Sequence, residues 1–210
     1  MTIQLHCFGE SGNAYKAALT MTLAGVEWEP VFVDFFNGAT RAPEFRKLNV
    51  MGEVPVMVDG DMVLTQSAVI QDYITSKTSK LGGRSADERR DVLRWMFFDN
   101  HKVSGLAGPL RFNTNFLPEE KRSADVNAFL LMRLKSALKV MDTHLDGRDW
   151  LAADHLTVAD IACAGYLYYD EPFGFDRSDF PNVDAWLDRL AATDGWKHPY
   201  DLMPRALPAA

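Results

Sequence analysis

The chain has 210 residues, enough for one large domain or two small ones, and a core of that size needs no disulfide or metal. Apolar residues make up 47% of the chain and charged residues 24%, which excludes a chain that is disordered throughout. The net charge is -7 and no basic run is longer than Arg89-Arg90, which argues against a nucleic-acid partner.

The sequence shows no sign of a disulfide framework, a signal peptide or a membrane span. The two cysteines, Cys7 and Cys163, are too few for a disulfide framework, and their spacing suits no metal site. Residues 1–7 lack the basic start and the long apolar stretch of a signal peptide, and the apolar run 161–169 is about half a membrane span. We therefore expect a soluble, cytoplasmic protein that uses no metal and binds neither membranes nor nucleic acid.

The first part of the chain alternates between strand and helix patterns. Residues 3–7 alternate in polarity and predict a strand. After a loop, residues 15–24 have helical spacing and predict a helix that ends at Gly25. Residues 27–35 alternate again and predict a second strand, for which Pro30 indicates an edge position.

A short helix and a hairpin follow. Residues 43–48 predict a helix with a proline in its first turn. Two short strands over 54–59 and 62–64 are joined by a hairpin at 59–61, and a further helix begins near Ser67. The order βαβ-α-ββα is the one that a thioredoxin-like α/β domain requires.

The polar, glycine-containing stretch 76–85 is typical of a linker. Beyond it, apolar residues recur three and four apart and predict helices over 87–103, 119–145, 158–169 and 183–192. Prolines punctuate these helices at Pro109, Pro118, Pro172 and Pro181. We therefore predict a thioredoxin-like domain over 1–80, an all-helical domain over 85–210 and a loose tail from residue 204 onward.

The segment 156–161 is the sharpest local motif. Thr157 as N-cap can accept a hydrogen bond from the Asp160 amide, while the Asp160 carboxylate reaches back to the Thr157 amide. Leu156 and Ile161 form the matching hydrophobic staple. Because the cap already uses the carboxylate, we predict a structural rather than a catalytic role for Asp160.

Pro55 stands at the start of a predicted strand. It is either a trans proline on an edge strand or a cis proline whose turn leaves the Val54 amide and carbonyl free for an extended ligand. Most bonds before proline are trans, so the residues by themselves favour the first alternative.

Ser67 opens a helix and is most simply its N-cap. A helix N-terminus is also a ready anion site, to which the neighbouring Gln66 adds donors. The residues give these two interpretations equal weight.

Ser11 lies between the first strand and the first helix. It is an N-cap or plain loop serine, a hydrolase nucleophile, or a hydroxyl aimed at a ligand. The hydrolase pattern Gly-x-Ser-x-Gly fails at Asn13, and no histidine offers itself as a partner. Signatures of metal sites, P-loops and dinucleotide folds are absent.

Taken together and in this order, the motifs are specific: the chain resembles the glutathione S-transferase superfamily over nearly its whole length. The resemblance rests on the βαβ-α-ββα unit, on Glu53-Val54-Pro55, on Gln66-Ser67 eleven residues past the proline, and on segment 156–161. It implies a thioredoxin-like domain followed by a helical one, a homodimer, and glutathione as co-substrate.

The resemblance also implies a set of glutathione-binding residues. In the family the proline is cis, and the preceding residue pairs through its backbone with the cysteinyl part of glutathione. The resemblance implies that these roles fall on Pro55 and Val54. In the family an acidic residue or Gln, followed by Ser, binds the γ-glutamyl carboxylate, and the resemblance implies this role for Gln66 and Ser67. Many members have Glu at the first position, but the Gln66 amide can still donate a hydrogen bond. Glu53 departs from the Lys or Gln of many members, and its charge would repel the glycyl carboxylate.

Ser11 and Lys16 match serine-type members, in which the activating hydroxyl lies five residues before a basic residue of the first helix. Residues 11–16 resemble bacterial members, and the loop 9–14 has neither the cysteine nor the tyrosine of other types. Ser11 would donate a hydrogen bond to the thiolate, which attacks a hydrophobic electrophile.

The resemblance places the electrophile pocket between the domains, with the segment 99–116 as its wall and His101, Arg111 and Asn113 as polar candidates. Two functions remain open: a glutathione transferase of the kind that serves detoxification, and a non-catalytic binding or scaffold protein with the same fold. The departures at Glu53 and Gln66 keep the second one open.

Overall fold

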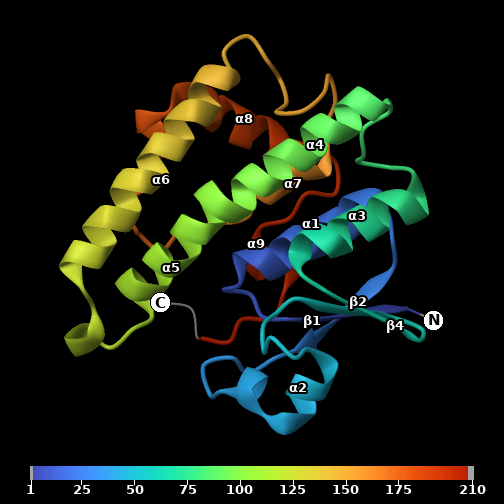
Figure 1. Cartoon of the computed structure of the whole chain (residues 1–210), viewed down its shortest axis with the longest axis vertical. Helices are drawn as coiled ribbons and strands as arrows, with labels where there is room; N and C mark the ends of the chain where they lie inside the picture. The colour runs from blue at the N-terminus through green and yellow to red at the C-terminus, as the bar shows by residue number, and fades with distance from the viewer. Residues whose placement is uncertain (1, 208–210) are drawn as a thin grey trace. The chain divides into compact units, whose positions relative to one another are not determined.

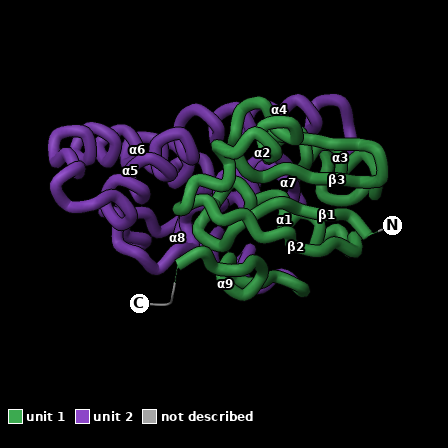
Figure 2. The backbone as a smooth tube through the Cα atoms, turned by 90° about the horizontal axis from the view of Figure 1, so that it is seen from below, with its two compact units in different colours: residues 1–82, 194–210 green, residues 83–193 purple. Residues whose placement is uncertain are grey.

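The computed structural model describes residues 2–207, which divide into two compact units (Figure 2). The residues up to Gly82 and those from Asp194 onward form unit 1, and Gly83–Thr193 form unit 2. The predicted helical domain, 85–210, therefore differs from unit 2 at its end, because residues 194–207 belong to unit 1. No helix within residues 2–207 is long and apolar enough to cross a membrane.

Unit 1 contains a four-stranded sheet in the order β2-β1-β3-β4. Its strands are β1 (Ile3–Cys7), β2 (Trp28–Phe32), β3 (Val56–Asp59) and β4 (Met62–Thr65). β1 is parallel to β2 and antiparallel to β3, and β3 is antiparallel to β4. The edge position of β2 agrees with its proline, and the predicted thioredoxin-like topology is confirmed.

Three helices cover this sheet. α1 (Gly12–Ala24) and α3 (Ser67–Thr78) lie on one face and pack against each other, and α2 (Pro43–Leu48) lies on the other face (Figure 1). α1 ends at Gly25, whose φ of 73° is the left-handed conformation predicted for it. A fourth, short helix of unit 1, α9 (Pro199–Leu202), packs on α1 and was not predicted.

Unit 2 is helical, as predicted. Its helices are α4 (Ala86–Phe98), α5 (Ser104–Asn115), α6 (Ala124–His144), α7 (Val158–Ala164) and α8 (Pro181–Ala191). A π-helical turn, Asp99–Val103, joins α4 to α5, so the predicted helix 87–103 changes its hydrogen bonding at residue 99.

α5 corrects the prediction that Pro109 separates two helices, because the helix runs through it. The proline lacks only the N–H that would bond to the carbonyl of Gly105 in the first turn. Leu106 and Leu110 are buried on the inner face of α5 while Pro109 is exposed. Burial of this face stabilises the helix despite the missing bond.

Asp160 organises the start of α7 as its motif predicted. Its carboxylate accepts hydrogen bonds from the Thr157 amide at 3.0 Å and hydroxyl at 3.1 Å, and the capping box is complete. It also accepts from the Leu151 amide at 2.8 Å and from the Trp186 indole at 3.0 Å, which the motif did not predict. Burial of Asp160 raises the pKa of its carboxyl, against the lowering effect of these donors.

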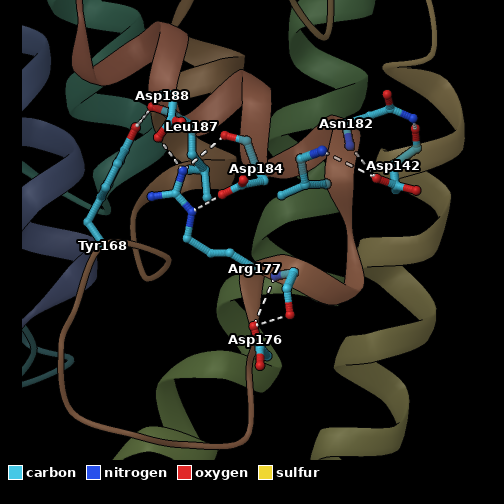
Figure 3. Close-up of polar contacts among 10 residues, drawn as sticks. Asp142, Tyr168, Asp176, Arg177, Asn182, Asp184, Leu187 and Asp188 are labelled. Carbon is cyan, nitrogen blue, oxygen red and sulfur yellow. Dashed lines mark hydrogen bonds and ion pairs between the residues drawn. The ribbon is translucent and has the colours of Figure 1, made fainter.

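Asp142 of α6 caps the start of α8 from outside (Figure 3). The N-cap position of α8 is Phe180, which has no side-chain acceptor, and the helix begins with a proline. Asp142 Oδ1 instead accepts from the Asn182 amide at 2.8 Å and the Val183 amide at 3.3 Å. Its backbone carbonyl accepts from Asn182 Nδ2 at 3.0 Å, so one residue holds α6 and α8 together.

We expect Asp142→Ala to lower the free energy of unfolding by about 2 kcal/mol, since two amides at the start of α8 lose their acceptor. Urea denaturation would measure the change. Asp142→Asn, which keeps one acceptor oxygen of the same shape, should lose about half as much. A change below ~0.5 kcal/mol for the alanine variant would contradict the capping role.

Candidate functional site

Ser11 lies in the turn that follows β1 and is the N-cap of α1. Its Oγ accepts a hydrogen bond from the Ala14 amide at 3.2 Å, and its carbonyl accepts from the Tyr15 amide at 2.9 Å. The side chain is largely buried, with 8% of the residue exposed. A hydroxyl that accepts one hydrogen bond keeps a proton to donate, so the N-cap role and the ligand role of Ser11 are compatible.

Lys16 lies one turn further along α1 and is buried. Its Nζ donates to Asn13 Oδ1 at 3.0 Å, and Asn13 lies in the first turn of the helix next to Ser11. The N-terminus of α1 carries no acidic residue in its first turn. Helix dipole and ammonium group therefore both favour negative charge near this turn.

The sheet brings the candidate residues of unit 1 to one of its ends. His6 pairs with Val56, so the end of β1 lies beside the beginning of β3. Val56 also pairs with Thr65, the last residue of β4. Ser11 follows β1, Val54 and Pro55 precede β3, and Gln66 and Ser67 follow β4. All five therefore lie at the same end of the sheet.

The Val54-Pro55 bond is cis. Of the two alternatives that the residues left open, the structure has the one that the resemblance implied. Residues 54 and 55 precede β3, whose pairing begins at Val56.

The loop before Pro55 is fixed from inside by Asn49. This side chain is buried, donates from Nδ2 to the Glu53 carbonyl at 2.8 Å and accepts from the Met51 amide at 3.0 Å. Gly52 has a φ of 67°, and a Cβ there would lie 2.8 Å from the Arg46 guanidinium. Asn49 was not among the predicted site residues, although Asn followed by glycine three residues later is a common turn signal.

Glu53 and Gln66 form a pair. Gln66 Nε2 donates to Glu53 Oε2 at 3.3 Å and lies 3.2 Å from Met51 Sδ. The carboxylate that was expected to repel an anionic ligand is thus held by a neutral amide of the same candidate site.

Gln66 rather than Ser67 is the N-cap residue of α3, which corrects the simpler interpretation of Ser67. Ser67 is the first helical residue, and the helix has no side-chain cap. Gln66 has a φ of 68° and a ψ of 121°, a backbone conformation that residues other than glycine rarely adopt. Backbone strain of this kind is often found at ligand-binding sites.

A comparison of Gln66→Gly with Gln66→Ala isolates this strain, because both variants lack the amide. The glycine variant relieves a cost of about 1–3 kcal/mol and loses about 0.4–1 kcal/mol through its freer unfolded chain. We expect its free energy of unfolding to exceed that of the alanine variant by about 1 kcal/mol in urea denaturation. Equal stabilities would show that position 66 is unstrained.

The electrophile candidates lie in unit 2. Arg111 is only 2% exposed, and its guanidinium binds Glu171 Oε2 at 2.7 Å and stacks on the Tyr169 ring at 3.7 Å. These contacts make Arg111 a support of α5 within unit 2. His101, in the π-helical turn, is exposed, and Asn113, on α5, is half-buried.

Both cysteines are buried, and burial raises the pKa of the Cys7 thiol to about 12. Neither is a ready nucleophile. Within residues 2–207, no group of three or more His, Cys, Asp or Glu side chains could hold a metal ion.

The end of the chain corrects a further expectation. Residues 204–207 are not a loose tail, because their backbone is hydrogen-bonded to the loop that precedes α1. The expected tail also included residues 208–210, which lie outside the described residues. No pattern in the sequence signals this contact, which joins residues almost 200 positions apart.

Comparisons with known proteins point in one direction. Residues 1–76 match the family described as "Glutathione S-transferase, N-terminal domain", and residues 110–194 match "Glutathione S-transferase, C-terminal domain". The chain is 32% identical over 155 residues to the "Glutathione S-transferase GST-4.5" of Xanthomonas campestris pv. campestris, which covers 72% of this chain and 76% of that protein.

Solved structures agree with the sequence relatives. A possible glutathione S-transferase from Rhodopseudomonas palustris has a TM-score of 0.86 and 32% identity, with 95% of this chain and 98% of that chain covered. A glutathione transferase from Burkholderia graminis, solved with two glutathione molecules bound per subunit, has a TM-score of 0.83 and 25% identity over 92% of this chain and 85% of that chain.

Proposed function

The chain belongs to the glutathione S-transferase superfamily, and we propose that it is a glutathione transferase in which the Ser11 hydroxyl activates the glutathione thiol. The observation that carries this proposal is the meeting of Ser11, Val54-Pro55 and Gln66-Ser67 at one end of the sheet. Three separate loops there present a hydroxyl, the backbone that leads into β3 and a helix N-terminus.

Each group has a part in binding the tripeptide. The backbone of Val54, which precedes the paired part of β3, would bond to the cysteinyl residue as an added strand does. The first amides of α3 and the Ser67 hydroxyl would bind the γ-glutamyl carboxylate, since a helix N-terminus attracts anions. This binding mode would direct the sulfur toward Ser11, and the glutathione-bound structure of the Burkholderia graminis transferase supports this class of ligand.

Ser11 would act by donating a hydrogen bond to the sulfur while its hydroxyl keeps the proton. A free thiol with a pKa of about 8.5 is only about 3% thiolate at pH 7, and half ionisation requires about 2 kcal/mol. One hydrogen bond to a charged acceptor supplies about 1.5–3 kcal/mol. The N-terminus of α1 and Lys16 add to this, so one serine suffices.

Glu53 works against tight binding of an anionic ligand, because Gln66 donates a neutral hydrogen bond but brings no charge. This pair favours a second candidate function, a non-catalytic binding or scaffold protein of the same fold. For an electrophile we propose His101 and Asn113 as polar contacts, whereas Arg111 is held by Glu171. A homodimer in the cytoplasm is part of the proposal.

Two measurements on the wild-type protein test the proposal. Isothermal titration calorimetry measures glutathione binding, and absorbance measures conjugation of a generic aryl halide. Glutathione binding with turnover supports the transferase, and absence of turnover supports the second candidate function. Absence of both would remove the proposed ligand itself.

A further inference from the structure

The last described residues of the chain clamp the loop that carries Ser11. The Gly9 amide donates to the Pro204 carbonyl at 2.7 Å, and the Tyr15 hydroxyl donates to the Lys197 carbonyl at 2.8 Å. A Cβ at Gly9 would lie 3.3 Å from both the Pro204 carbonyl oxygen and Arg205 Cα. These contacts would be tighter than is usual for a Cβ, so the two segments approach closely at Gly9.

The Glu10 side chain links this loop to residues 206 and 207. Its Oε2 accepts from the Ala206 amide at 3.0 Å, and its Oε1 accepts from the Ala206 amide at 3.2 Å and the Leu207 amide at 2.9 Å. Only 5% of Glu10 is exposed, which is unusual for a carboxylate. Such burial requires donors, and two consecutive backbone amides supply them.

We propose that Glu10 is a positioning residue for Ser11, and that residues 204–207 form a strap that completes the site by holding Glu10. The inference rests on the proposed function, since it concerns the serine that activates glutathione. Glu10 directly precedes Ser11, so the direction of its side chain determines how the backbone enters the N-cap turn. The strap orients the serine hydroxyl, and misplacement of a catalytic group by about 1 Å can cost up to a hundredfold in rate.

The charged groups near the loop include Glu10 itself, Lys16 on α1 and Arg205 on the strap. Lys16 donates to Asn13 and lies on the α1 side of the loop. The Arg205 guanidinium stacks on the Tyr200 ring at 3.6 Å. Substitutions that spare all three charges can therefore test the strap without changing the local charge.

Proline substitutions remove the strap's donors while the chain keeps its length and charge. Ala206→Pro removes one amide, and Ala206→Pro with Leu207→Pro removes both amides that Glu10 binds. Ala206→Ser is the matched control, because it changes the same side chain and keeps the amide. Glutathione binding, kcat and KM for conjugation, and the pKa of the bound thiol, read from thiolate absorbance, are measured for each protein.

We expect the double proline variant to lose about tenfold in kcat and to raise the pKa of the bound thiol by about one unit, with glutathione affinity changed less than threefold. Ala206→Pro should lie between it and the control, and Ala206→Ser should match the wild type. In the background of Ser11→Ala the proline substitutions should shift the pKa of the bound thiol no further, because they act through Ser11.

An unchanged thiol pKa and kcat in folded proline variants would overturn the positioning role. So would a further shift in the Ser11→Ala background, since the strap would then act on the sulfur without the serine. Thermal denaturation identifies a variant that fails to fold, in which case Ala206→Pro alone decides the question. If the wild-type protein neither binds glutathione nor catalyses conjugation, the proposed function fails. If the wild type is active and the proline variants have the same kcat and thiol pKa, only the role of the strap is refuted.

Discussion

Ser11→Ala should conjugate an aryl halide about 10- to 30-fold more slowly than the wild type at pH 7, because a free thiol is still about 3% thiolate there. The loss follows from the hydrogen bond to the thiolate, worth about 1.5–3 kcal/mol, without which the pKa of the bound thiol returns toward about 8.5. The deficit should shrink as the pH rises above that value, because the thiol then ionises without help. A pH profile of kcat/KM for the two proteins measures both effects.

The same substitution removes the N-cap of α1, so stability has to be separated from chemistry. Ser11→Thr keeps both the hydroxyl and the cap and should retain most of the turnover. Ser85→Ala removes an equivalent cap from α4, whose Ser85 Oγ accepts from the Glu88 amide at 3.1 Å. It should cost about 1 kcal/mol of stability and leave the thiol pKa unchanged. Full turnover by Ser11→Ala would withdraw Ser11 from the mechanism.

Local patterns in the sequence predicted most of the fold. Strand alternation at 3–7, the left-handed Gly25 and the capping box at Thr157 and Asp160 are each set by neighbouring residues, and each is observed. The prediction was wrong where tertiary contacts outweigh local preference. α5 runs through Pro109 because its inner face is buried, which no window of sequence around a proline can indicate.

The candidate site shows the same division. Pro55 and the pair Gln66-Ser67 became candidates for ligand binding through the resemblance to a family, because the residues by themselves left a trans proline and a plain N-cap open. The positive φ of Gln66 could not be predicted, because the position has neither the Gly nor the Asn that usually adopts this conformation. Glu10 was missed for a different reason: its donors are backbone amides at 206 and 207, and backbone groups leave no trace in a sequence.

The largest loss of stability is expected for Asp160→Ala. Four donors on three residues converge on this carboxylate, from Leu151, Thr157 and Trp186, and all three residues are buried. Each unsatisfied buried donor costs about 1–3 kcal/mol, part of which relaxation recovers. We expect the free energy of unfolding to fall by about 4 kcal/mol, a large part of the total for a domain of this size.

Asp160→Asn separates the shape of the side chain from its ability to accept. The amide retains one acceptor oxygen and places an NH₂ group against donors, so about half of the loss should remain. Asp146→Ala is the matched control, because Asp146 is exposed at the end of α6 and its replacement should change stability by less than about 0.5 kcal/mol. Urea denaturation of the three variants orders them. If Asp160→Ala lost no more than Asp146→Ala, the loop at Leu151 and the indole of Trp186 would have to be held by other contacts, and the capping box would be a local feature of α7 alone.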